Sequence, residues 1–343
     1  MSRWLSFLVV LAACSAGPSA GRSGPPPATT TTASTGDTAV APSVIEESFE
    51  QGPLQVDVLF VVDNSCSMSM FQDILGLGAA SLIQPLIDSG VDFHIGVTST
   101  DTSTDPTDPC FNDANTPPLD GRLQESFGAA WVDANDPSPF DLFQALVQLG
   151  ERGSGCEMGL EAAYKAMELR TQANAGFRRA DADLHTVVVS DEDDQSEDWS
   201  DATVITQTEF IDWYALFPHA SFHSMVCLTE GDAQAGGTGS CSHFNIGERY
   251  VGVTDASGGS KMNILEASSS ITALGEGFVP AGRADYALAQ PADEATLEVW
   301  LRSAGTEVDL TGQFTYDAAT QTVTLTGILP SEGDEVVITY VPL

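Results

Sequence analysis

Asp63, Ser65 and Ser67 combine a carboxylate with two hydroxyl groups on one short segment. They follow directly on residues 55–62, which read QVDVLFVV. A β-branched, apolar run of this kind is typical of a strand buried on both faces of a parallel sheet. In open α/β sheets, ligands bind beyond the carboxyl ends of the strands. Because hard cations such as Mg²⁺ prefer oxygen ligands, the sequence predicts a divalent cation site at this turn.

The elements that must position this turn alternate between strand-like and helix-like patterns. Strands are predicted over residues 55–62, 92–98, 184–190 and 220–228, and helices over residues 140–149, 157–169, 209–216 and 264–274. A further helix-like stretch follows the metal-site turn, and Pro85 is expected to kink or end it. Residues 99–139 are predicted to form a loop. The alternation predicts an α/β domain with a mostly parallel sheet.

The pattern changes after about residue 281, where no helix-length segment remains. Short strands are predicted over residues 296–301, 308–316, 322–326 and 336–341, separated by turn-like breaks. We therefore expect residues 281–343 to form a small antiparallel β module, similar to a sandwich. This module carries no residues that suggest chemistry.

The turn after the first strand, together with the Val-rich strand that ends in Ser190 and Asp191, resembles von Willebrand factor A-like domains. The resemblance covers residues 55–274 and implies a doubly wound, mostly parallel α/β domain over residues 53–280. It also implies a metal-ion-dependent adhesion site. There Asp63, Ser65, Ser67 and Asp191 would hold a divalent cation, Mg²⁺ before Ca²⁺ or Mn²⁺. An Asp or Glu carboxylate from a protein partner would complete the metal shell.

One position departs from this family. Its members supply a metal-binding threonine from a glycine-rich loop, and the matching loop here, residues 153–159, has Cys156 at that place. A thiol is a poor ligand for Mg²⁺. Two alternatives remain open: Ser154 or Glu157 supplies the missing oxygen, or Cys156 forms a disulfide with Cys66 and leaves a modified or weakened site.

The N-terminus has the pattern of an exported protein. A positive start at Arg3 precedes a short apolar run over residues 4–13, which ends in LAAC. This ending resembles a bacterial lipobox, with an ordinary secretory signal as the alternative. We therefore expect a signal peptide over residues 1–13, a lipidated Cys14, and an unstructured Pro/Thr/Ser-rich linker over residues 14–52. Ser15 favours the outer membrane of a Gram-negative bacterium, at the cell surface or its periplasmic face.

An oxidising compartment favours disulfides among the other cysteines. Cys227 and Cys241 flank a glycine-rich loop and are expected to pair, whereas Cys110 has no predicted partner. His223 and His243 lie near these cysteines, but a zinc site there is disfavoured because the paired Cys-x-x-Cys spacing is missing.

Asp193 and Asp194 suggest an auxiliary Ca²⁺ site. A solvated acidic loop that caps the following segment is the favoured interpretation.

The overall charge and an absent motif argue against further classes of function. The net charge is −37, from 49 acidic and 12 basic residues, so nucleic-acid binding is excluded on electrostatic grounds. No His-Glu-x-x-His motif of a metal-dependent hydrolase occurs. The sequence therefore favours a non-enzymatic adhesion or protein-interaction module, anchored to a membrane through lipid. The alternatives are a structural surface lipoprotein with a degenerate metal site and a metal-dependent hydrolase.

Overall fold

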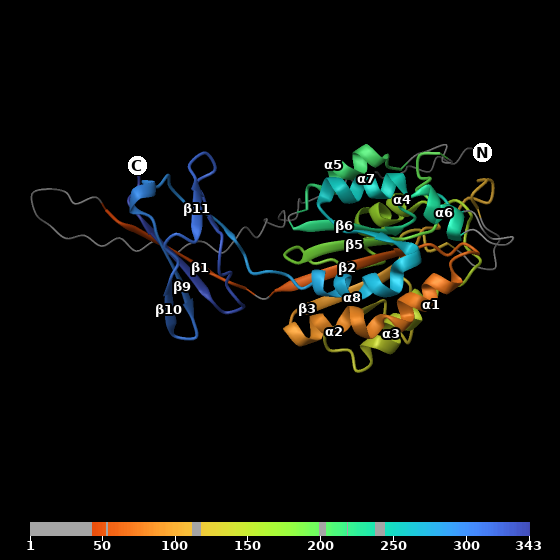
Figure 1. Ribbon diagram of the computed structural model, residues 1–343, viewed down its shortest axis with the longest axis horizontal. Helices are drawn as coiled ribbons and strands as arrows, with labels where there is room; N and C mark the ends of the chain where they lie inside the picture. The colour runs from red at the N-terminus through yellow and green to blue at the C-terminus, as the bar shows by residue number, and fades with distance from the viewer. Residues whose placement is uncertain (1–42, 53, 112–117, 199–203, 218, 237–243) are drawn as a thin grey trace, which may run out of the picture. The chain divides into compact units, whose positions relative to one another are not determined.

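The computed structural model describes residues 43–52, 54–111, 118–198, 204–217, 219–236 and 244–343. The chain forms two compact units (Figure 1). One is Pro53–Gly282. The other combines the segment before it, up to Gly52, with Arg283–Leu343. The second unit is therefore built from two stretches of chain that lie on either side of the first in the sequence.

The larger unit contains a six-stranded sheet in the order β4-β3-β2-β5-β6-β7. Its strands are β2 (Gln55–Val62), β3 (Asp92–Ser99), β4 (Trp131–Asp133), β5 (Asp183–Val189), β6 (Ala220–Val226) and β7 (Lys261–Asn263). All neighbours are parallel except β4, which pairs antiparallel with β3 at the edge. The predicted α/β fold with a mostly parallel sheet is confirmed.

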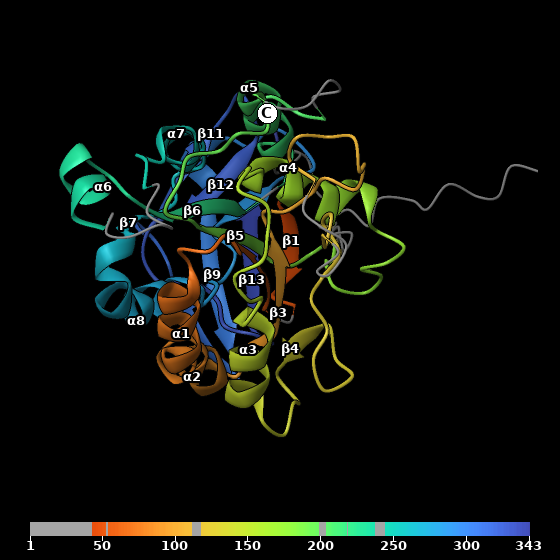
Figure 2. The same ribbon diagram turned by 90° about the vertical axis from the view of Figure 1, so that its right-hand side faces the viewer.

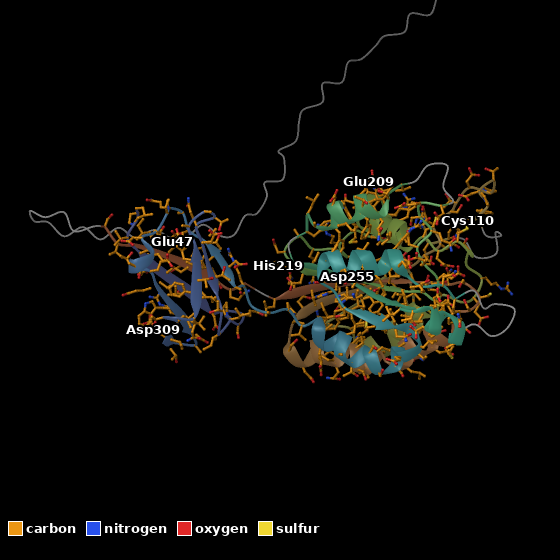
Figure 3. All side chains as sticks on the ribbon, turned by 45° about the horizontal axis from the view of Figure 1, so that its top comes forward. Glu47, Cys110, Glu209, His219, Asp255 and Asp309 are labelled. Atoms are coloured by element: carbon orange, nitrogen blue, oxygen red, sulfur yellow. A yellow bond between two sulfur atoms is a disulfide. The ribbon has the colours of Figure 1, made fainter. Side chains whose placement is uncertain are left out.

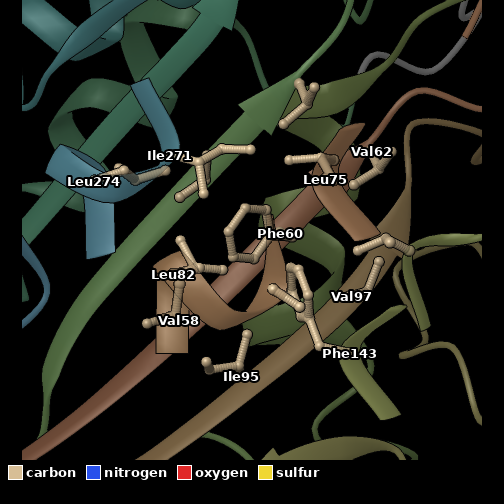
Figure 4. Close-up of a cluster of buried hydrophobic side chains, with 14 of the residues drawn as sticks. Val58, Phe60, Val62, Leu75, Leu82, Ile95, Val97, Phe143, Ile271 and Leu274 are labelled. Carbon is tan, nitrogen blue, oxygen red and sulfur yellow. The ribbon is translucent and has the colours of Figure 1, made fainter. Parts of the chain in front are cut away.

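Helices cover both faces of this sheet (Figures 1 and 2). One face packs against α1 (Ser69–Leu77), α2 (Ala79–Ser89), α3 (Pro139–Val147) and α8 (Ala267–Gly277), and the other against α4 (Gly159–Tyr164), α5 (Gln207–Tyr214) and α7 (Glu248–Ser257). Phe60 of β2 lies at the centre of the first core, with Phe143, Leu82 and Ile271 around it (Figure 4). Because β2 contributes to both cores, nearly every position in it must be apolar, which explains its continuous run.

The helix after the metal-site turn differs from the expectation. Pro85 lies inside α2 and does not end it; the break falls instead at Gly78, between α1 and α2. A Cβ atom at Gly78 would lie 2.6 Å from the side chain of Ile271, so this position needs glycine to let α8 approach. The joined stretch Ser69–Ser89 is long and apolar enough to cross a membrane by length and composition, but its inner face, including Leu82, belongs to the core.

The smaller unit is an antiparallel β module, as predicted. It has one sheet in the order β1-β13-β9-β10 and a second in the order β11-β12-β8. The strands are β1 (Ile45–Glu50), β8 (Asp285–Ala287), β9 (Glu298–Ser303), β10 (Thr306–Asp309), β11 (Phe314–Asp317), β12 (Thr322–Leu325) and β13 (Glu335–Tyr340). The single strand expected over residues 308–316 is two strands, β10 and β11, that belong to different sheets.

The expectation that residues 14–52 are wholly unstructured is wrong at their end. β1 pairs along its length with β13, from Ile45 opposite Tyr340 to Glu50 opposite Glu335. Phe49 is buried in the core of the module, and the carboxylate of Glu47 accepts hydrogen bonds from the Ala289 amide and the Tyr340 hydroxyl. Long-range pairing thus orders a segment whose local composition predicts a linker.

Four shorter elements of the larger unit were not predicted. These are β4, β7, α6 (Glu230–Gly236) and α7. The predicted helix over residues 157–169 is α4 followed by a π-helical turn, Lys165–Leu169.

A hydrogen-bonded pair of histidines joins β5 to β6. His223 Nδ1 accepts a hydrogen bond from the Ser260 amide, at 3.1 Å, so its proton must be on Nε2. That Nε2–H donates to Nδ1 of His185, at 3.0 Å, which places the proton of His185 on its own Nε2. Both rings are buried beside Phe278. Burial lowers the pKa of His185 to about 3 and that of His223 to about 4, so both rings are neutral in the folded protein.

We predict that this pair destabilises the protein in acid. Both folded-state pKa values lie below the unfolded value of 6.5, so the unfolded chain binds more protons once the pH falls below about 6.5. Going from pH 7.5 to 5 should cost about 2 kcal/mol of unfolding free energy per histidine. Urea unfolding of the wild type and of His185→Gln/His223→Gln at both pH values measures it. An equal pH dependence in the two proteins would contradict the prediction, because the carboxylates titrate alike in both.

Candidate metal centre

The turn after β2 curls so that its three oxygen-bearing side chains lie close together. The Ser65 amide donates to Asp63 Oδ1 at 2.7 Å, and the hydroxyls of Ser65 and Ser67 lie 3.2 Å apart. Asp63 is fully buried and Ser65 is nearly so. The sheet ladder continues to the edge of the turn, since the Asp63 amide donates to the Val189 carbonyl at 2.9 Å. The local geometry therefore brings together the carboxylate and both hydroxyls that the sequence predicts.

Asp191 reaches the same place from the end of β5, the strand next to β2. It is fully buried, and neither of its carboxylate oxygens has a hydrogen-bond partner of good geometry among the described residues; the nearby Ser67 hydroxyl favours its charged form. The preceding residue, Ser190, links the two strands, because its hydroxyl donates to Asp63 Oδ2 at 2.7 Å. Asp63 and Asp191 thus face one another across the carboxyl ends of adjacent parallel strands.

Glu157 supplies a third carboxylate from the loop before α4. It is fully buried, and its carboxyl group contacts that of Asp63. The Thr100 hydroxyl, just beyond the end of β3, donates to Glu157 Oε2, whereas Oε1 has no hydrogen-bond donor among the described residues. Ser154 and Glu157 were the two oxygen ligands proposed for the loop of residues 153–159. The structure brings Glu157, and not Ser154, to Asp63.

The loop that carries Glu157 is held tightly against the turn after β2. The Gly153 amide donates to the Asn64 carbonyl at 2.8 Å. A Cβ atom at Gly153 would lie 2.2 Å from the Asn64 side chain, so any other residue there would force that side chain to move. The Gln72 side chain, on α1, donates to the carbonyls of Asp63 and Gly150 and accepts from the Gly150 amide. These contacts fix the relative position of the two loops.

Mutual repulsion and burial disturb the ionisation of the whole cluster. Burial and the charge of Asp63 raise the pKa of Asp191 to about 8, and the same two causes raise the pKa of Glu192 to about 7. Burial raises the pKa of Asp63, and burial together with the Asp63 charge raises the pKa of Glu157 well above its ordinary value. Buried carboxylates that repel one another are stabilised by a cation, or else take up protons.

These residues fit a hard, oxygen-ligated cation. Among the described residues, no group of three or more His, Cys, Asp or Glu side chains is placed to hold a metal by itself, so a ligand set here must include hydroxyls. Ser65 and Ser67 provide them beside Asp63 and Asp191. The carboxylate oxygens of Asp191 and Oε1 of Glu157 lack donors, as expected of atoms that await a cation. A bound divalent ion would supply charge neutralisation and an open coordination position.

Ser154 serves a different role. Its hydroxyl donates to the Cys110 carbonyl at 2.7 Å and accepts from the Cys156 amide at 3.0 Å. These contacts stabilise a disulfide between Cys110 and Cys156. The hydroxyl of Ser154 is thus engaged by the disulfide loop.

Both predicted disulfides are wrong. Cys156 pairs with Cys110, not with Cys66, because the loop after β3 folds over the Glu157 loop and brings Cys110 to 5.5 Å from it, measured between Cα atoms. Cys66 is itself disulfide-bonded. Cys227 is a buried free thiol at the end of β6, so it does not pair with Cys241, which lies outside the described residues. At the scale of the whole unit, Cys110 lies at the end opposite His219 (Figure 3).

The structure places the remaining candidates in capping roles. Asp194 Oδ1 accepts from the Leu160 amide at the start of α4, and Asp193 Oδ1 accepts from the Arg249 amide near the start of α7. The capping role is therefore present, but the loop is not solvated as expected, because Asp194 is buried and caps the earlier helix α4, whereas Asp193 caps the later helix α7. His223 bonds to His185 instead, and His243 lies outside the described residues.

Sequence reasoning missed Thr100, Gln72 and the bonding role of Ser190. Thr100 and Ser190 share one signal that could have found them. Each carries a hydroxyl directly after a strand buried on both faces, where side chains turn toward the site. Gln72 gave no such signal, because the two loops that it bridges, at Asp63 and at Gly150, are distant in the sequence.

Comparison with known proteins finds distant likenesses only. No family profile and no curated protein matches the sequence. Among solved structures, the chain is similar to a von Willebrand factor type A protein from Catenulispora acidiphila, with 15% identity over 88% of this chain and 61% of that one, and a TM-score of 0.40.

Two further structures are adhesive proteins by their titles. The pilus adhesin SpaC from Lactobacillus rhamnosus GG is 9% identical, over 91% of this chain and 42% of that one, with a TM-score of 0.41. Proximal thread matrix protein 1 from the mussel byssus, with a zinc-occupied MIDAS motif, is 12% identical, over 71% of this chain and 51% of that one, with a TM-score of 0.39. The chain spans less than two thirds of each of these proteins, and likeness at this level concerns the fold alone.

We predict that the Cys110–Cys156 disulfide stabilises both the domain and the Glu157 loop. Its 46-residue separation corresponds to about 4 kcal/mol of unfolding free energy in the chain-entropy model. Urea unfolding of Cys110→Ser/Cys156→Ser should show a loss of this order. Because Cys156 precedes Glu157, the same variant should bind Mn²⁺ about tenfold more weakly, as expected when the support of a metal shell is loosened. Unchanged stability and unchanged affinity would contradict the prediction.

Proposed function

We propose that the protein is a non-enzymatic adhesion or protein-interaction module that binds its partner through a divalent cation. In this proposal Asp63, Ser65, Ser67 and Asp191 hold the ion, Mg²⁺ before Ca²⁺ or Mn²⁺, in the manner of a von Willebrand factor A-like domain. Glu157 lies in the loop from which this family supplies its threonine, and its carboxyl group contacts that of Asp63.

One observation carries the proposal. Asp191 is fully buried, its two carboxylate oxygens have no hydrogen-bond partner of good geometry among the described residues, and Asp63 repels it. A buried carboxylate without a partner is strongly unfavourable, and a folded protein retains one where a ligand compensates. A cation between Asp63 and Asp191 removes both the repulsion and the missing hydrogen bonds.

The partner would complete the shell through an open position on the ion. The expected ligand is an Asp or Glu carboxylate of a protein. The third carboxylate changes the charge at this position, because Asp63, Asp191 and an ionised Glu157 together exceed the charge of a divalent ion.

Metal binding tests the proposal directly. Calorimetric titration with Mg²⁺, Mn²⁺ and Ca²⁺ should give a dissociation constant of about 1 mM or tighter. Asp63→Ala and Asp191→Asn should each weaken binding at least about 100-fold, since loss of even an outer-shell group costs about 10- to 100-fold. At pH 7 binding should also release protons, because the pKa of Asp191 is about 8 without metal.

Asp255→Asn is the matched control, because Asp255 is exposed and pairs only with Lys261 on the protein surface (Figure 3). Failure of the wild type to bind any of the three ions would refute the proposal and support a structural protein with a degenerate site. Phosphoesterase activity that Asp63→Ala abolishes would instead support a metal-dependent hydrolase.

We further propose that the module is held at the outer membrane of a Gram-negative bacterium. The pattern over residues 1–14 supports a signal peptide over residues 1–13 and lipidation of Cys14, followed by a linker that ends where β1 begins. Labelling of growing cells with radioactive palmitate should therefore mark the protein, and Cys14→Ser should abolish the label. Equal labelling of the two proteins would contradict the anchor, and Cys227→Ser serves as the control for other cysteines.

A further inference from the structure

An open cleft of about 810 Å³ lies beside the metal site. Three segments line it: the loop after β5, helix α6, and the stretch that leads into α7. The cleft is joined to the site through its wall, because the Asn245 amide donates to the carbonyl of Asp191 at 2.9 Å. A partner bound at the metal therefore has this cleft next to it.

The rim of the cleft carries more negative than positive charge. The lining carboxylates are those of Asp193, Asp194, Asp198, Glu230 and Glu248, and the basic side chain among the lining residues is that of Arg249. That guanidinium is already engaged, since it pairs with Asp198 at 2.7 Å and donates to the Asp194 carbonyl. The described residues therefore leave Glu230 and Glu248, both exposed, without a cationic partner in the cleft.

The base of the cleft is apolar. Ala233, Phe244 and Ile246 contribute to it, and Phe244 is held from behind by Phe71 of α1, with ring centroids 6.0 Å apart. An apolar base under an acidic rim suits one kind of side chain. Lys and Arg bury an aliphatic stem along apolar surface and keep a positive head in water.

We propose that this cleft receives a basic segment of the protein partner, whose Lys or Arg side chains lie on Phe244 and Ile246 and pair with Glu230 and Glu248. The inference rests on the proposed function for the identity of the partner as a protein bound at the metal site. It adds that the surface recognised beside the metal is cationic. An acidic segment would meet uncompensated like charge here and would be repelled.

A cation alone does not explain the cleft. Oδ1 of Asp193 and both oxygens of Asp194 already accept hydrogen bonds, and Asp198 is paired with Arg249. Glu230 and Glu248 begin different helices, α6 and α7, and an extended basic segment can meet both.

The test uses a short fluorescein-labelled peptide of alternating Lys and Ala, with a Glu and Ala peptide as the opposite probe. Binding to the full chain is followed by fluorescence anisotropy at about 0.15 M salt, where exposed charges more than about 8 Å apart are screened. Glu230→Gln/Glu248→Gln should weaken binding of the Lys peptide by about fivefold, as expected for two exposed ion pairs. The Glu peptide should not bind.

Glu266→Gln/Glu276→Gln is the matched control, because it removes the same charge from exposed positions on α8 and just before it. It should weaken binding by less than about twofold. Equal weakening by the two double variants, or no binding of the Lys peptide, would overturn the proposal, since the attraction would then be general or absent. Circular dichroism checks that both variants fold.

Repeating the titration with a metal chelator and with Asp63→Ala separates this inference from the metal site. One outcome is that the rim and control variants still differ with chelator and in Asp63→Ala, while calorimetry shows that the wild type binds no metal. In that case the cleft proposal stands and the metal-dependent function fails. If metal binds normally but rim and control variants behave alike, the cleft proposal fails alone.

Discussion

The larger unit buries three carboxyl groups that repel one another at the carboxyl ends of its parallel strands. Asp63, Asp191 and Glu157 come from three segments that are far apart in the sequence, and none of them has a basic side chain beside it among the described contacts. Without a cation, such a cluster opposes folding, because its carboxyl groups must either stay charged without a counter-charge or take up protons. The loops around it must therefore be held by forces that do not depend on the site itself.

Three kinds of interaction hold these loops in place. The parallel ladder of β2 and β5 fixes Asp63 and Asp191 at adjacent strand ends. Gln72 bridges the turn after β2 to the loop before α4 through backbone groups, and a disulfide holds Cys156 next to Glu157. The site is thus built before any ion arrives, which lowers the ordering cost that a flexible site would meet on binding. A preformed site of this kind would take up an ion without large movement of the domain.

The sequence predicts the central strands closely and the loops poorly, for one physical reason. β2 and β5 are buried on both faces, so almost every residue in them must be apolar, and their ends fall within about one residue of prediction. Asp63 follows from that, because it comes directly after β2, whereas Asp191 was assigned through the resemblance to von Willebrand factor A-like domains. Cys110 and Cys156 could not be paired in advance, because their pairing depends on how two irregular loops cross. β1 was missed because its strand structure depends on β13, almost three hundred residues away.

That distant pairing has a consequence for how the chain folds. The β module is interrupted by the entire larger unit, and contacts such as that between Glu47 and Tyr340 span 293 residues. Contacts of high sequence separation form late, because a long loop must close first. The larger unit can fold as soon as its own strands exist, but β1 stays an unpaired edge until β13 has been made. Until residues 335–340 have been made, β1 keeps an unpaired backbone edge, which can pair wrongly with other strands.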